Sequence, residues 1–159
     1  MKTINQWFDE YAVSHQNKTN KIIHWICIPA IFISILGLVS AIPSQVVKGI
    51  FPEIVQEYAN WGSLLLLLVL VFYLVHSIKL FIGMLIWSVF CIWVVSQLNI
   101  STIPLWQSSI VIFIVAWIGQ FYGHHIEGKK PSFLKDIQFL LIGPAWLMSF
   151  IYTKLRIKY

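Results

Sequence analysis

Four long apolar stretches constrain the fold of this chain more than any other feature of its sequence. They cover Ile22–Ala41, Ser63–Val75 with His76 at its end, Phe81–Leu98 and Pro104–Gly123. A helix of about 20 apolar residues crosses the hydrocarbon core of a bilayer. Only 11% of the residues are charged, whereas a soluble domain has about 25%. The chain is therefore predicted to be all-α, a polytopic membrane helical bundle with four full spans that forms a single integral membrane domain over residues 1–159.

Two further segments flank these spans. Residues 4–15 carry apolar side chains at helical spacing, which predicts an N-terminal amphipathic helix on the membrane or against the bundle. Ile137–Tyr152 is apolar but short, and Gly143 and Pro144 interrupt its middle. A full crossing here would carry the basic C-terminal tail to the opposite side of the membrane. We therefore predict a re-entrant or interfacial C-terminal hairpin made of two half-helices.

The basic residues predict the orientation in the membrane. With a cytoplasmic N-terminus, Lys48 alone of the 11 lysines and arginines would lie on the far side. The net charge of +5 then reflects membrane topology, and no nucleic acid partner is expected. Both termini are predicted to be cytoplasmic. The Ile- and Lys-rich composition favours a bacterial inner membrane, or the endoplasmic reticulum membrane if the source is eukaryotic.

This topology places all five histidines near the cytoplasmic face. They are His15, His24, His76, His124 and His125. Each one alone could be an interfacial histidine that bonds to backbone or to lipid phosphate. Together they predict a metal site, because neutral imidazole binds Fe, Zn, Cu and Ni. The best-placed ligands are His15, His24 and His124. The other two histidines, His76 and His125, could supply a further ligand or support the site.

The segment from Gln120 to Pro131 is the densest in polar side chains. On a continuing helix, Gln120, His124 and Glu127 share one face. A glutamine in a membrane span needs a partner, which could be a ligand histidine or a substrate oxygen. Glu127 could be a ligand, could orient a ligand imidazole, or could pair with Lys129 or Lys130, and we favour the last two roles.

Two motifs taken together resemble those of the small membrane 2-hydroxy-fatty-acid dioxygenases. They are Tyr11…His15-x-Asn17-x-x-Asn20-x-x-x-His24-x-x-x-x-Pro29 and Gln120-Phe121-x-Gly123-His124…Glu127-Gly128-x-Lys130-Pro131. The resemblance covers essentially the whole chain. It implies Fe(II)-dependent α-oxidation, in which a 2-hydroxy long-chain fatty acid and O2 give the fatty acid one carbon shorter. It also implies that the motif histidines, His15, His24 and His124, are essential for catalysis. Many relatives have another residue at the position of His125, and His76 belongs to no matching motif.

The implied chemistry suits these side chains. An all-histidine site leaves the charge of Fe(II) uncompensated, which favours an anionic substrate that chelates through its carboxylate and 2-hydroxyl. The lysines at 129 and 130 would attract that carboxylate, and the acyl tail would lie among Phe72, Leu80, Phe113 and Phe121. The residues expected to support the metal or the substrate are Tyr11, Asn20, His76, Gln120, Glu127 and Lys130.

Three other functions fit the same residues. A non-enzymatic membrane scaffold or assembly protein would use its histidines only at the interface. A haem protein would need two histidines that face each other across helices. A zinc lipid hydrolase would need a general base such as Glu127. The chain has no HExxH, GxSxG or Walker lysine motif, so none of these well-defined hydrolase or nucleotide sites is indicated.

Overall fold

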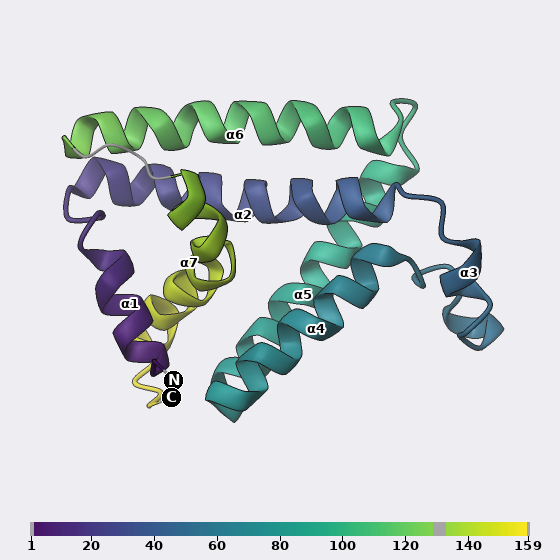
Figure 1. Cartoon of the computed structure of the whole chain (residues 1–159), viewed down its shortest axis with the longest axis horizontal. Coiled ribbons are helices and arrows are strands. Elements are labelled where there is room, and N and C mark those ends of the chain that lie inside the picture. Colours follow the sequence, from purple (N-terminus) through teal and green to yellow (C-terminus); the bar gives the residue numbers. More distant parts are fainter. Residues whose placement is uncertain (1, 129–132, 159) are drawn as a thin grey trace.

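The computed structural model describes residues 2–128 and 133–158, which form helices and connecting turns with no strand (Figure 1). The helices are α1 (Ile4–Ala12), α2 (Lys18–Ser40), α3 (Gln45–Lys48), the 3-10 helix η1 (Glu53–Val55), α4 (Trp61–His76), α5 (Ile78–Asn99), α6 (Leu105–Glu127) and α7 (Phe133–Lys154). The prediction of an all-α fold is confirmed for this part of the chain.

Three of these helices, α2, α5 and α6, are long and apolar enough to cross a membrane. The shorter apolar helices are α4, with 16 residues, and the Phe139–Lys154 part of α7. Large apolar side chains are exposed along the outer faces, for example Leu68 at 70% and Ile118 at 62%. Such surfaces suit contact with lipid. The chain is therefore consistent with a membrane protein, and the number and direction of its crossings stay a prediction.

The predicted C-terminal hairpin is wrong, because residues 133–154 form the one continuous helix α7 with Pro144 inside it. A proline removes one helical hydrogen bond and crowds the carbonyl of the preceding turn. Packing offsets this cost, since Ile142, Ala145 and Trp146 are buried in the main hydrophobic core. The continuous helix lets the Tyr152 hydroxyl near its end donate a hydrogen bond to a backbone carbonyl in the first turn of α5.

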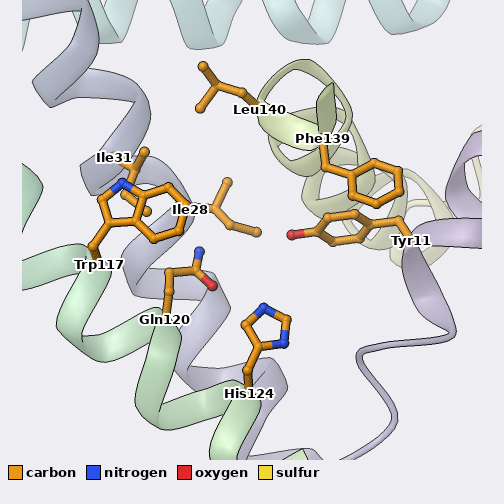
Figure 2. Close-up of a pocket in the computed structure, with 8 residues that line it drawn as sticks. All are labelled: Tyr11, Ile28, Ile31, Trp117, Gln120, His124, Phe139 and Leu140. Atoms are coloured by element: carbon orange, nitrogen blue, oxygen red, sulfur yellow. The ribbon is translucent and has the colours of Figure 1, made fainter. Parts of the chain in front are cut away.

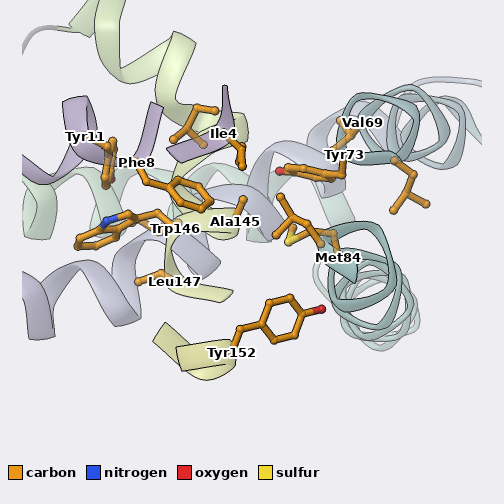
Figure 3. Close-up of a cluster of buried hydrophobic side chains, with 14 residues drawn as sticks. Ile4, Phe8, Tyr11, Val69, Tyr73, Met84, Ala145, Trp146, Leu147 and Tyr152 are labelled. Carbon is orange, nitrogen blue, oxygen red and sulfur yellow. The ribbon is translucent and has the colours of Figure 1, made fainter. Parts of the chain in front are cut away.

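The main core joins α1, α4, α5 and α7, and Ile28 of α2 also belongs to it (Figure 3). The amphipathic helix α1 contributes Ile4, Phe8 and Tyr11, which lie on one face of the helix. It begins at the predicted residue and ends at Ala12, slightly earlier than expected. Tyr73 of α4 is completely buried within this core. The N-terminal helix is therefore part of the bundle, and this position brings the chain that follows it beside α2 and α6.

The two longest helices, α2 and α6, lie side by side along their whole length (Figure 1). Small residues permit this close approach. A Cβ atom added at Gly119 of α6 would lie 2.6 Å from the Cys27 sulfur of α2, and one added at Gly123 would collide with the Asn20 side chain. Glycines four residues apart are a known device for close packing between membrane helices. The contact brings the N-terminal end of α2 to the C-terminal end of α6.

The small-residue contact between α2 and α6 can be tested with Gly119→Ala. The added methyl group would press against the Cys27 sulfur, and overpacking of this kind costs about 1–3 kcal/mol. We expect a lower midpoint of thermal unfolding in detergent. The double variant with Cys27→Ala should recover most of the loss, because it removes the colliding sulfur. Additive effects of the two substitutions would contradict a direct contact at this position.

Candidate metal centre

A turn between α1 and α2 sets the positions of the first two histidines. The Asn17 side chain caps α2 by accepting hydrogen bonds from the backbone N–H groups of Thr19 and Asn20. His15 precedes this cap, and His24 lies in the second turn of α2. The chain reverses between them, and their ring centroids are 4.2 Å apart. The turn therefore makes both rings face one site.

The third histidine, His124, comes from the last turns of α6. Its ring centroid lies 5.4 Å from that of His15 and 5.0 Å from that of His24. Each of the three rings offers one nitrogen, and these nitrogens all lie within 4.8 Å of one another. All three side chains are buried. Within the described residues, no other group of three or more histidine, cysteine or acidic side chains has this geometry.

Hydrogen bonds orient two of the three rings. The Nδ1 atom of His15 lies 2.7 Å from the Tyr11 carbonyl oxygen, and that of His24 lies 2.9 Å from the Asn20 carbonyl oxygen. A carbonyl only accepts, so each Nδ1 carries the hydrogen and each Nε2 presents a lone pair. Metal-binding histidines are commonly fixed in this way.

One further ring nitrogen of each histidine has no hydrogen-bond partner of ordinary geometry among the described residues. His15 Nε2, His24 Nε2 and His124 Nδ1 are all buried without a hydrogen bond. Leaving a buried polar atom unpaired costs about 1–3 kcal/mol, and three such atoms gathered in one place call for a common explanation. A metal ion accepts all three lone pairs at once, so these residues fit one.

The His15 imidazole is neutral at physiological pH. Burial lowers its pKa from 6.5 to about 4. The hydrogen bond to the Tyr11 carbonyl opposes this shift, and the neighbouring His124 adds to it. A neutral ring keeps its lone pair, which is the state that binds a metal.

Glu127 fastens the His15 loop to the end of α6. Its carboxylate accepts hydrogen bonds from the backbone N–H groups of Gln16 and Asn17, at 2.8 and 2.9 Å, and from the side-chain amide of Asn20, at 3.0 Å. Asn20 is completely buried and also donates to the Ser14 carbonyl. Glu127 is not among the three grouped candidate ligands. Its hydrogen bonds position the loop that carries His15.

The other predicted site residues lie elsewhere. His125 is exposed and outside the triad. His76 ends α4, where its Nδ1 lies 2.8 Å from the Phe72 carbonyl oxygen and its ring packs on the Phe72 ring. It is likewise not among the three grouped histidines. Lys129 and Lys130 lie outside the described residues.

A small pocket of about 40 Å³ adjoins the histidines (Figure 2). Its lining residues are Tyr11, Ile28, Ile31, Trp117, Gln120, His124, Phe139 and Leu140. The Tyr11 ring also stacks on His15, with centroids 4.2 Å apart and planes 14° from parallel. Of the predicted supporting residues, Tyr11 and Gln120 thus meet beside the site. Of the four residues expected to hold an acyl tail, none lines this pocket, and Leu80 is completely buried in the main core.

Trp146 is a site residue that the sequence did not single out. It comes from α7, packs against the Tyr11 ring and lies with its centroid 5.4 Å from that of His15. One of eight tryptophans in an apolar chain carries no local signal for such a role. Only the packing of α7 against α1 places it over the histidines.

Comparison with known proteins gives one match. The model of the family described as 2-hydroxy-palmitic acid dioxygenase Mpo1-like matches residues 1–155. Comparisons with the curated proteins and with the solved structures find no match.

The positioning role of Glu127 can be tested with Glu127→Ala. Loss of its three hydrogen bonds should loosen the His15 loop, and substitutions that remove such supporting contacts lower metal affinity by about 10- to 100-fold. Anaerobic titration with Fe²⁺ against a competing chelator measures this change. Glu57→Ala, at an exposed glutamate between η1 and α4, is the matched control and should have no effect. Unchanged affinity in Glu127→Ala would contradict the positioning role.

Proposed function

Because the chain belongs to the 2-hydroxy-palmitic acid dioxygenase Mpo1-like family, we propose that it is an Fe(II)-dependent dioxygenase that acts on 2-hydroxy long-chain fatty acids. The observation that carries this proposal is the convergence of three buried, unpartnered imidazole nitrogens, from His15, His24 and His124. Iron would supply the redox chemistry that activates O2, while the protein fixes geometry and excludes water.

The three histidines would hold the metal as neutral ligands. The carbonyls of Tyr11 and Asn20 keep the Nδ1 hydrogens of His15 and His24 in place, so both Nε2 lone pairs stay directed into the site. The described candidate ligand group contains no carboxylate, and the divalent charge would therefore be left for the substrate to neutralise. A 2-hydroxy acid suits such a site, because its carboxylate and hydroxyl can chelate together.

The proposed reaction balances with O2 as the sole oxidant. In 2-hydroxypalmitate the C1–C2 bond breaks, C2 becomes the carboxylate of pentadecanoate, and C1 leaves as CO2. This oxidation releases four electrons, which reduce O2, and the products pentadecanoate, CO2 and water account for all the atoms of 2-hydroxypalmitate and O2. No further reductant is needed, and the chain's residues bind, orient and shield the reacting head.

Several contacts favour this proposal over its rivals. A scaffold would have no use for three buried nitrogens without partners. The three rings, with centroids 4.2–5.4 Å apart, are too close together to bind opposite faces of a haem. Glu127 accepts three hydrogen bonds, which makes it a poor general base for a zinc hydrolase. We also propose that the site faces the cytoplasm of a bacterial inner membrane, following the distribution of lysine and arginine.

Elemental analysis followed by oxygen uptake tests the proposed reaction. Protein purified in mild detergent is expected to contain about one iron per chain. With 2-hydroxypalmitate it should consume one O2 for each pentadecanoate formed, and chelation of iron should stop both. Metal-free protein would favour the scaffold, a Soret band would favour haem, and bound zinc with no oxygen uptake would favour a zinc hydrolase.

Histidine variants test the assignment of the ligands. His24→Ala and His124→Ala each remove one of three ligands, so bound iron and turnover should both be lost. His125→Ala and His76→Ala are matched controls, because these histidines lie outside the triad, and both variants should keep their iron. Full activity in His24→Ala or His124→Ala would rule out the ligand role, and loss of iron in His125→Ala would add a fourth ligand.

A further inference from the structure

The pocket beside the triad has a closed polar end and an apolar opening. Tyr11, Gln120 and His124 are all buried, with 5–7% of their surface exposed. The Tyr11 hydroxyl, the Gln120 amide and the His124 ring point into the same space from two sides (Figure 2). Phe139, Trp117 and Leu140 are only half-buried, so the pocket opens on their side.

The size of this pocket limits what can enter it. Its volume is about 40 Å³, and a water molecule needs roughly 10–15 Å³ of such volume. There is room for a group of a few heavy atoms, such as a carboxylate with a neighbouring hydroxyl. A chain of more than ten methylene groups does not fit, so the tail of a long-chain acid must lie elsewhere.

The surface next to the opening suits an acyl chain. Trp117 and Leu140 pack on a small apolar cluster between α2 and α6 that also includes Ile31 and Phe113. Beyond them the outer face of α6 exposes Ile114 and Ile118. A tail that leaves the pocket here stays in contact with apolar side chains and reaches the lipid.

We propose that this pocket binds only the head of the substrate and that the acyl chain passes Trp117 and Leu140 into the lipid. The Tyr11 hydroxyl donates to a carboxylate oxygen, and the Gln120 amide recognises the 2-hydroxyl. This inference rests on the proposed function, which it extends by assigning the residues that select a 2-hydroxy acid. The protein then discriminates strictly between head groups and weakly between chain lengths.

Gly143 of α7 keeps the polar end open. A Cβ atom added there would lie 3.2 Å from the Ile28 Cγ2 atom and 3.5 Å from the Tyr11 hydroxyl oxygen. The first of these contacts is tighter than most packed side chains accept, so Ile28 would have to move, and both residues line the pocket. A larger residue at 143 would therefore narrow the space in which Tyr11 meets the substrate.

Binding without turnover tests this assignment directly. Iron-loaded protein in detergent, kept free of O2, is titrated calorimetrically with 2-hydroxypalmitate and with palmitate. We expect the wild type to prefer the 2-hydroxy acid by about tenfold or more. Tyr11→Phe should weaken the binding of both acids by about 3- to 10-fold, because one hydrogen bond is lost. Gln120→Leu should lower the preference for the 2-hydroxy acid over palmitate by a similar factor. Tyr122→Phe, at an exposed position near Gln120, is the matched control.

Gly143→Ala provides a third variant and should weaken binding of the 2-hydroxy acid. The iron content of each variant reports whether the triad is intact. A variant that loses its iron is left out, and the comparison uses the other two. Wild-type affinity and preference in the iron-loaded variants would overturn the inference.

Chain length gives a second readout. For 2-hydroxy acids of 12 to 18 carbons, the affinity for the protein should change with chain length only as much as the partition of these acids into protein-free micelles changes. A steeper dependence would overturn the placement of the tail in lipid. If the wild type binds iron and forms pentadecanoate but the expected binding results are not obtained, only this inference is wrong. If the wild type holds no iron and binds neither acid, the proposed function falls with it.

Discussion

Close contact between α2 and α6 is the constraint on which the site depends. Gly119 and Gly123 leave no side chain between the helices, so Cys27 and Asn20 of α2 lie directly against the α6 backbone. This spacing allows imidazoles from the two helices to approach one ion, because a histidine side chain is short compared with an ordinary helix separation of 8–10 Å. The same contact brings the C-terminal end of α6 beside the cap of α2. Glu127 can then hold the preceding loop by three hydrogen bonds.

The environment of the histidines explains why an ion suits them. Tyr11 and Trp146 cover His15 on its outer side, and burial keeps the pKa of that ring near 4. Buried nitrogens without hydrogen bonds are costly by themselves and favourable around a divalent cation. Aromatic side chains from α1 and α7 therefore have two effects at once. They stabilise the bundle through the main core, and they keep water away from the reacting head of a substrate.

Where prediction from sequence failed, packing had overridden a local signal. Gly143 and Pro144 predicted a break, yet the residues around them are buried in the core and α7 continues through the proline. The glycine has another use, because the missing side chain leaves room for Ile28 and the Tyr11 hydroxyl. His76 was expected near the same membrane face, as a further ligand or a supporting residue. It lies at the end of α4, where its Nδ1 atom bonds to the Phe72 carbonyl of the same helix, and it is not grouped with the other three.

Sequence alone determined the helical class and the apolar stretches, because these follow from composition and local periodicity. It also determined the candidate metal ligands through two motifs. Tertiary structure decided how these three histidines meet, what Glu127 binds and where a pocket opens. Those features join residues far apart in the sequence, such as Asn17 and Glu127. No local pattern records such distances, since they arise only when helices pack and each side chain competes for the same space.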